Sequence, residues 1–156
     1  MYALFVSSYL LRMGERYSMQ SLKEFWTAVR LRATPLIVIE SHDEIATARN
    51  ILEYSNETGT VPLWNWDCAR GYQAGNSLAD CWESPLSDCL QVEDALIELD
   101  KPERIPAMSV VIYHWRNEYW QSPQCRQGII NLRESFKRKM QALCIIVPFG
   151  SEIPGD

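Results

Sequence analysis

Four short, largely unbroken runs of apolar residues most constrain how this chain can fold. They are residues 36–39, 61–66, 108–113 and 143–147, and each follows a segment whose apolar residues recur at helical spacing. Continuous apolar runs are typical of strands in a parallel sheet, because helices cover both faces of such a sheet. The sequence therefore predicts a three-layer α/β domain, with a mostly parallel sheet and helices on both faces.

The helical pattern predicts helices over residues 21–33, 92–99 and 127–141, and a further helix that follows Ser41 and stops before Gly59. Their expected inward-facing side chains are Leu22, Phe25, Trp26, Val29, Ala33, Ile45, Ala48, Ile51, Leu52, Val92, Ala95, Leu96, Leu99, Ile129, Leu132, Phe136 and Met140. Ser41 and Glu44 are spaced as a capping box and predict the start of the second helix. Residues 69–87 hold glycine, proline and asparagine, so we expect a long, partly mobile connection there.

Length, charge and cysteine content limit the function classes. A chain of 156 residues fits one domain. A net charge of -5 with a pI near 5.1 disfavours nucleic-acid binding through bulk charge. The five cysteines form no Cys-x-x-Cys pair, so we expect neither a disulfide framework nor a zinc ribbon, and we expect Cys144 to act as a small apolar residue.

The sequence shows no segment that predicts a membrane or secretory role. The apolar runs are too short to span a bilayer, and no basic stretch precedes the apolar residues near the N-terminus. We therefore expect a cytoplasmic location and no membrane partner.

The first apolar run ends in a turn that is chemically unsuited to phosphate. A nucleotide-hydrolysing α/β domain carries a glycine-rich loop with a lysine there. Here the run continues as Glu40-Ser41-His42-Asp43-Glu44, whose carboxylates would repel a phosphate. The third run leads into His114, without the acidic residues that would hold magnesium. We expect no catalytic residue of this kind, no metal and no cofactor in the chain.

Three strand-end residues support an alternative. His42, Cys68 and His114 each follow a predicted strand, so they could share one edge of the sheet. Imidazole and thiol groups bind zinc and also form nucleophile–base pairs. The alternative is a small enzyme with a His/Cys site, whereas the simpler interpretation is a set of polar strand ends.

Aromatic residues are dense in two stretches, which contain Trp64, Trp66, Tyr72, Trp82, Trp115, Tyr119 and Trp120. Alternation along a strand puts Trp64 and Trp66 on one face, so we expect this pair in the core. Aromatic and arginine side chains are enriched at protein interfaces. The candidate partner-binding residues are therefore Arg70, Tyr72, Arg116, Tyr119 and Trp120.

Charge is distributed unevenly along the chain. Residues 80–103 are strongly acidic, whereas the predicted helix at 127–141 is basic. Solvated helix faces explain this pattern most simply. A head-to-tail contact between two copies is the alternative.

The order of these segments resembles a known family. Residues 31–44, Val-Pro-Leu-Trp-Asn-Trp and its continuation to Tyr72, residues 92–97, 110–113, 131–135 and 144–154 carry the resemblance. Together they are similar to the N-terminal domain of the AAA+ ATPases of the hypothetical-chloroplast-reading-frame (Ycf-type) family, with bacterial and phage relatives. The similarity covers roughly residues 20–154. The family pattern has an acidic residue just after the third strand, near the place that Trp115 occupies here.

The resemblance implies a degenerate RecA-like (P-loop-like) domain over residues 20–150. Residues 1–19 would form an N-terminal appendage of unknown role, and residues 151–156 would begin the linker to a C-terminal AAA+ module. ATP and Mg would bind that module, and the plastid stroma would be the equivalent of the cytoplasmic location. The expected partners are the module and one or more proteins, with a possible homo-oligomer.

The expected function is that of a non-catalytic N-terminal domain, which recruits partners or substrates or supports ring assembly. Two alternatives stay open at this point. One is the standalone enzyme with the strand-end site, and the other is a nucleotide- or nucleic-acid-binding module.

Overall fold

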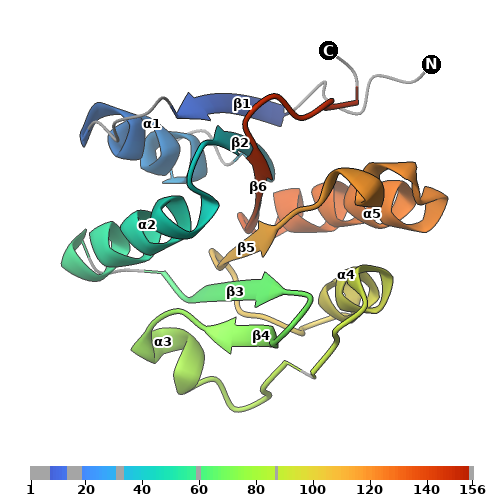
Figure 1. Ribbon diagram of the computed structural model, residues 1–156. Coiled ribbons are helices and arrows are strands. Elements are labelled where there is room, and N and C mark those ends of the chain that lie inside the picture. The colour runs from blue at the N-terminus through green and yellow to red at the C-terminus, as the bar shows by residue number, and fades with distance from the viewer. Residues whose placement is uncertain (1–7, 14–18, 31–33, 59–60, 87, 155–156) are drawn as a thin grey trace.

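The computed structural model describes residues 8–13, 19–30, 34–58, 61–86 and 88–154. Strands and helices alternate along most of the chain (Figure 1). The strands are β1 (Ser8–Met13), β2 (Leu36–Ser41), β3 (Leu63–Asp67), β4 (Gly71–Ala74), β5 (Val110–His114) and β6 (Ala142–Pro148). The helices are α1 (Met19–Arg30), α2 (Glu44–Thr58), α3 (Ser77–Asp80), α4 (Val92–Asp100), the 3-10 helix η1 (Asn117–Gln121) and α5 (Pro123–Arg138).

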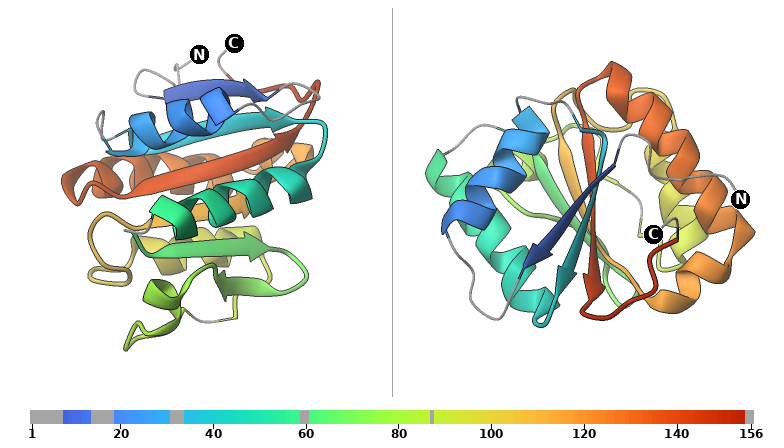
Figure 2. Two further views of the ribbon diagram at one scale, coloured as in Figure 1. Left: turned by 90° about the vertical axis from the view of Figure 1, so that its left-hand side faces the viewer. Right: turned by 90° about the horizontal axis from the view of Figure 1, so that it is seen from above.

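The strands form one six-stranded sheet in the order β1-β2-β6-β5-β3-β4. Neighbours from β1 to β3 are parallel, and only β4 runs antiparallel, against β3. Helices α1 and α2 cover one face, whereas α4 and α5 cover the other (Figure 2). The predicted fold class is confirmed.

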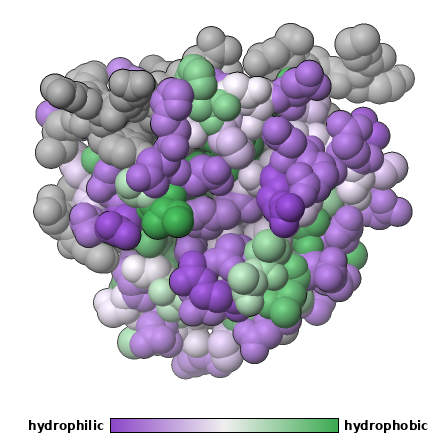
Figure 3. Space-filling model, in the orientation of Figure 1, coloured by the Kyte–Doolittle hydropathy of each residue, from purple (hydrophilic) through white to green (hydrophobic). Residues whose placement is uncertain are grey.

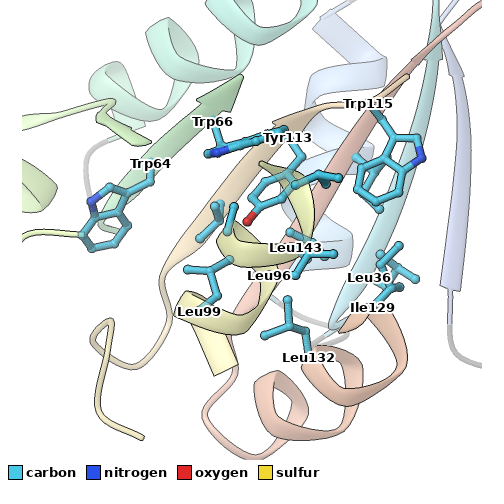
Figure 4. Close-up of a cluster of buried hydrophobic side chains, with 14 of the residues drawn as sticks. Leu36, Trp64, Trp66, Leu96, Leu99, Tyr113, Trp115, Ile129, Leu132 and Leu143 are labelled. Carbon is cyan, nitrogen blue, oxygen red and sulfur yellow. The ribbon is translucent and has the colours of Figure 1, made fainter. Parts of the chain in front are cut away.

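Alternation along the central strands divides the core between the two faces. In β2, Ile37 and Ile39 pack toward α1 and α2, whereas Leu36 and Val38 pack toward α4 and α5. All six residues of β2 are buried, because both faces are covered. The core on the α4 and α5 side is rich in aromatic rings, and it includes both Trp64 and Trp66 as predicted (Figure 4).

Residues 8–13 of the expected N-terminal appendage are part of this sheet. They form β1, which pairs in parallel with β2 from Ser8 opposite Leu36 to Met13 opposite Ser41. The strand supplies backbone partners along the outer edge of β2. Residues 1–7 and 14–18 of the expected appendage lie outside the described residues.

Two predicted core positions are wrong. Ile45 is 68% exposed in the first turn of α2, and Met140 is 45% exposed just beyond α5. Met140 also has a left-handed backbone, with φ of 55°, so the helix has already ended there. The expected inward position Ala33 lies outside the described residues, whereas Cys144 is fully buried in β6 as predicted.

Three helix and strand boundaries also differ from expectation. The α2 cap is Asp43, because its Oδ1 accepts from the backbone N of Ala46 at 2.9 Å. Helix α5 begins at Pro123, one turn earlier than predicted, with Ser122 as its cap. The expected connection over residues 69–87 contains β4 and α3, because β4 is held by pairing with β3.

The acidic and basic segments lie side by side within one chain. Helices α4 and α5 pack together on the same face of the sheet. Lys139 Nζ is 3.1 Å from Glu103 Oε1, and Ser135 Oγ donates to Asp100 Oδ1 at 3.2 Å. These contacts within one chain account for part of the charge pattern.

Candidate functional site

The carboxyl edge of the parallel strands is the first place to look for a site in this fold, because ligands bind there in open α/β sheets. The arrowheads of β3 and β6 point to one side in the left view of Figure 2, and that side faces the reader in Figure 1. From this edge β2 leads to α2 on one face, whereas β5 leads to η1 and α5 on the other. Strand β6 lies between β2 and β5 in the sheet.

The turn from β2 to α2 is closed by its own side chains. Ser41 Oγ accepts from the backbone N of Asp43 at 3.0 Å and lies 2.6 Å from Thr47 Oγ1. Thr47 donates to the Asp43 carbonyl at 2.8 Å, and the Asp43 carboxylate caps the helix. A phosphate at a helix N-terminus would need these backbone donors free. The carboxylate of Asp43 already occupies that position.

The end of β6 is fixed against the same turn. Glu40 is 6% exposed, and its Oε1 accepts from the backbone N of Gly150 at 2.7 Å. The exposed ring of His42 stacks on Phe149, with ring centroids 3.9 Å apart. These contacts hold the β2 and β6 ends together.

The end of β5 carries a half-buried histidine. His114 Nε2 lies 3.0 Å from Asn65 Oδ1 on β3. Burial lowers the pKa of His114 below its ordinary value of 6.5; nearby Asp67 raises it and Arg70 lowers it. The imidazole is therefore neutral at pH 7, and it donates to the Asn65 oxygen.

The turn between β3 and β4 is an ordered, charged corner. Asp67 Oδ1 accepts from the backbone N of Ala69 and of Arg70, at 2.9 and 2.8 Å. Its Oδ2 pairs with the exposed Arg70 guanidinium at 2.7 Å. Partial burial acts to raise the pKa of Asp67, but the hydrogen bonds from Arg70 and Ala69 outweigh it and lower the pKa.

Between these two strand ends lies a pocket of about 350 Å3, which we call the Cys68 pocket. Its lining comes from three segments and consists of Cys68, Leu90, Gln91, Val92, Glu93, Arg116, Glu118, Tyr119 and Ser122. The exposed Cys68 lies beside Arg116 and Tyr119 in this lining. Arg116 also pairs with Glu118 at 2.7 Å. Burial raises the pKa of Tyr119, so its hydroxyl stays protonated as a donor.

Figure 3 shows the carboxyl edge as a mainly hydrophilic face. The apolar side chains form separate patches on it rather than one continuous surface. Such a face suits polar contacts with an occasional apolar anchor.

Comparison with known proteins identifies the family. A protein-family model described as "SpoVK-like AAA ATPase, N-terminal domain" matches residues 20–156. The chain belongs to this family. Searches of curated proteins and of solved structures found no match.

Within this SpoVK-like N-terminal domain, three of the five predicted contact residues reach the carboxyl-edge surface. Arg70 and Arg116 are exposed, and Tyr119 is half-buried beside Cys68. Their role in binding a partner stays a prediction.

The other two predicted contact residues are buried. Tyr72 is 6% exposed, and its hydroxyl donates to the Ala95 carbonyl at 2.5 Å. Trp120 is 4% exposed and packs on Trp115, with ring centroids 4.9 Å apart. Both belong to the aromatic core of the domain rather than to its surface.

The alternative strand-end site is not assembled in this SpoVK-like domain. Strand β6 lies between β2, which precedes His42, and β5, which ends at His114. His42 stacks on Phe149, His114 contacts Asn65, and Cys68 contacts Arg116. In the part of the chain that the structure describes, no three His, Cys, Asp or Glu side chains are grouped closely enough to hold a metal ion.

Sequence reasoning missed the part of the pocket that comes from the start of α4 and of α5. Ser122 Oγ donates to Glu93 Oε1 at 3.0 Å and accepts from the backbone N of Cys125 at 3.2 Å. Ser122-Pro123 is a typical helix start, with proline in the first turn, and it could have located the cap. Its contact with Glu93 joins residues 29 positions apart, which no local pattern shows.

Among the described residues, no helix is both long enough and apolar enough to cross a membrane. Helix α5, at 16 residues the longest, carries charged residues along its length.

Proposed function

We propose that this domain is a non-catalytic recruitment module of an AAA ATPase, which binds a protein partner or substrate through its carboxyl-edge surface. We further infer that it is a degenerate RecA-like domain, close to the Ycf-type AAA+ ATPases and working in the cytoplasm or the plastid stroma. ATP and Mg would then bind to a C-terminal AAA+ module outside this chain, and a homo-oligomer would follow from ring assembly.

The closed β2–α2 turn is the observation that carries the proposal. Membership of an AAA ATPase N-terminal domain family connects the domain to ATP-driven work. At the strand end where a nucleotide-binding fold holds phosphate, this chain instead places Asp43 on the helix N-terminus. The turn therefore favours a role other than nucleotide hydrolysis.

The carboxyl-edge surface supplies groups suited to a protein partner. Arg116 and the half-buried ring of Tyr119 line the Cys68 pocket, and the exposed Arg70 lies on the turn between β3 and β4. Arginine and tyrosine are the side chains that most often anchor interfaces. Glu118 and Asp67 hold the two guanidinium groups in place.

Nucleotide binding is tested directly with the 156-residue chain. Tryptophan fluorescence and equilibrium dialysis are recorded during titration with ATP·Mg, and released phosphate is measured over the same range. We expect no saturable binding and no turnover. Turnover that survives purification, and that an Asp43→Ala change alters, would contradict the proposal.

The recruitment surface is tested with matched charge variants. Arg70→Glu and Arg116→Glu change the carboxyl-edge surface, whereas Lys137→Glu changes an exposed cation in the last turn of α5, at the opposite edge of the sheet. Each is tagged and used to recover proteins from cells of the source. Proteins recovered by the natural chain and by Lys137→Glu, but lost with both carboxyl-edge variants, are the expected result. Equal recovery by all four chains would rule out this surface.

The same titration addresses the nucleic-acid alternative. Single-stranded oligonucleotides are added at low salt, where binding to phosphate is strongest. We expect no quenching of tryptophan fluorescence. A saturable quench that salt removes would favour the nucleic-acid-binding module instead.

A further inference from the structure

The opposite, amino edge of the sheet contains a second pocket. It has a volume of about 210 Å3 and lies between the loop after α4 and the end of α5. Leu99, Ile105 and Phe136 line it, and each of them is at most 3% exposed. We call it the amino-edge pocket. Its walls offer room and apolar contact for one medium-sized side chain.

The rim of the amino-edge pocket is cationic in a chain whose net charge is -5. The lining includes Lys101, Arg104, Arg138 and Lys139, against only Asp100 and Glu103. Lys101 and Arg104 both pair with the buried Glu98, at 2.5 Å each, so the cations that remain for a ligand are Arg138 and Lys139. Lys139 pairs with Glu103, whose side chain is 89% exposed. Arg138 has no ion-pair partner among the residues that the structure describes.

Strained backbone gathers at the same edge. Glu103, Met108 and Met140 have φ values of 57°, 64° and 55°, and they are the non-glycine residues with left-handed backbone in the described part of the chain. Residues with a Cβ adopt this conformation at an energetic cost, and such positions cluster at binding sites. Hydrogen bonds tie the strained loops together: Met108 N donates to the Lys139 carbonyl at 3.0 Å.

Two methionines stand beside the pocket with exposed side chains. Met108 is 46% exposed and Met140 is 45% exposed. They directly precede the segments that enter β5 and β6, which are linked where Ala142 N donates to the Ser109 carbonyl at 3.0 Å. Flexible methionine side chains are common at surfaces that adapt to a peptide.

We propose that the amino-edge pocket binds an acidic peptide segment of a protein partner, with one apolar side chain in the pocket and carboxylates on Arg138 and Lys139. Charge complementarity selects the occupant, because the unpaired Arg138 and the weakly held Lys139 lie at the mouth of an apolar cavity. Exposed ion pairs such as Lys139–Glu103 exchange readily for a new carboxylate. The proposal concerns the edge opposite to the Cys68 pocket, so it stands or fails independently of the carboxyl-edge surface.

The test begins with a random heptapeptide library displayed on phage and selected against the full 156-residue chain. Enriched sequences are synthesised with a fluorophore, and their affinities are measured by anisotropy. We expect acidic residues flanking one Leu, Ile, Met or Phe. No enrichment, or enrichment of basic sequences, would overturn the proposal.

Matched variants then locate the binding site. Arg138→Gln and Arg138→Glu should weaken the selected peptide, the latter by about tenfold, because a charge contact at an interface is lost or reversed. Arg126→Glu, at the other end of α5, and Arg116→Glu, in the Cys68 pocket, should leave the affinity unchanged. Equal weakening by all the charge variants would mean that the peptide responds to net charge only, and would refute the assignment.

A gain of affinity provides a readout that misfolding cannot imitate. Glu103→Gln removes the carboxylate that competes for Lys139, so it should tighten peptide binding by roughly threefold. Unchanged or weaker binding would count against the proposed contact. Analytical ultracentrifugation of the chain alone provides a further check. If the chain sediments as a dimer and Arg138→Gln dissociates that dimer, the occupant is a second copy and the proposal is overturned.

Discussion

At the residue scale, the aromatic core is organised by a few polar atoms that must find partners. Tyr113 stacks on Trp66 with ring centroids 4.8 Å apart, and its hydroxyl is hydrogen-bonded to that of Tyr72. Tyr72 donates to the Ala95 carbonyl, so Tyr113 is the donor between the two hydroxyls. Burial raises the pKa of the Tyr72 hydroxyl, and its contact with Tyr113 raises it further. Burial also raises the pKa of the Tyr113 hydroxyl. Both hydroxyls therefore remain protonated donors.

This arrangement predicts an asymmetric response to losing either hydroxyl. Tyr113→Phe removes one bond and leaves Tyr72 paired, so it should cost about 0.5–1.5 kcal/mol in unfolding free energy. Tyr72→Phe leaves the fully buried Tyr113 hydroxyl without its acceptor, and it should cost about 1–3 kcal/mol. Urea unfolding of both variants measures the difference. A larger loss for Tyr113→Phe would show that the donor order is reversed.

His114 predicts the pH dependence of stability. Burial lowers its pKa in the folded chain, so below the ordinary value of 6.5 the unfolded chain binds more protons than the folded one. The contribution of the neutral His114 to the unfolding free energy is complete above pH 6.5. It is lost as the pH falls toward the pKa that His114 has in the folded chain.

We therefore expect His114→Gln to flatten the decline in unfolding free energy between about pH 7 and about pH 5. His42→Gln, which changes the exposed second histidine, serves as the matched control for the loss of an imidazole ring. Parallel curves for the natural chain and His114→Gln would be inconsistent with a buried, neutral imidazole.

At the element scale, the end of α5 shows a helix stop built without glycine. Gln141 N donates to the Phe136 carbonyl at 2.9 Å, and Met140 N donates to that of Lys137 at 3.4 Å. This is the Schellman pattern, whose left-handed position usually holds glycine. Met140 occupies it here with φ of 55°. The helix therefore ends through its hydrogen bonds and not through a favourable residue.

Met140→Gly should consequently stabilise the chain by about 0.5–1 kcal/mol, because glycine adopts left-handed backbone without strain. Met140→Ala should give no such gain, since alanine keeps the Cβ. Chemical denaturation of the two variants side by side separates backbone strain from loss of the methionine side chain. Destabilisation by glycine would mean that the exposed side chain contributes more than the strain costs.

At the scale of the whole molecule, the sheet depends on a strand that precedes the region matched by the family. Strand β1 lies outside residues 20–156, yet it pairs along the entire length of β2. Without it, the backbone groups on that side of β2 would form an exposed edge. Such edges lose stability and invite association with other chains.

Deleting residues 1–19 should therefore lower the midpoint of thermal unfolding and increase light scattering, because β2 becomes an open edge. Deleting residues 1–7 retains β1, which begins at Ser8, and should leave both measurements close to those of the natural chain. If both truncated chains match the full one, β1 contributes little to the fold.

Much of the fold could be predicted from the sequence because its strands are buried on both faces. Burial of this kind demands continuous apolar runs, so β2, β5 and β6 are visible without any tertiary information. Strand β4 could not be recognised in the same way. Gln73 and Ala74 of β4 are exposed at the edge of the sheet, so the strand has no continuous apolar run. Only its pairing with β3 makes it a strand.

Less of the candidate site could be predicted, because its residues come from segments far apart in the chain. Arg116 and Tyr119 were visible as an arginine and an aromatic residue after a strand, but their contact with Cys68 depends on the pairing of β3 with β5. The burial of Tyr72 and Trp120 depends on which helices cover that face. Neither the contact with Cys68 nor the burial of these two aromatic side chains follows from the spacing of residues along the chain.

The sequence by itself determined the layered α/β class and the lack of a glycine-rich phosphate loop after β2, because hydrophobic periodicity and the chemistry of a short turn are local properties. The tertiary structure alone decided the strand order, the edge position of β1 and the two pockets. Each of these depends on contacts between distant residues, such as Glu103 with Lys139 or Glu93 with Ser122. Such contacts form only when the chain has folded and paid the entropy of bringing its segments together.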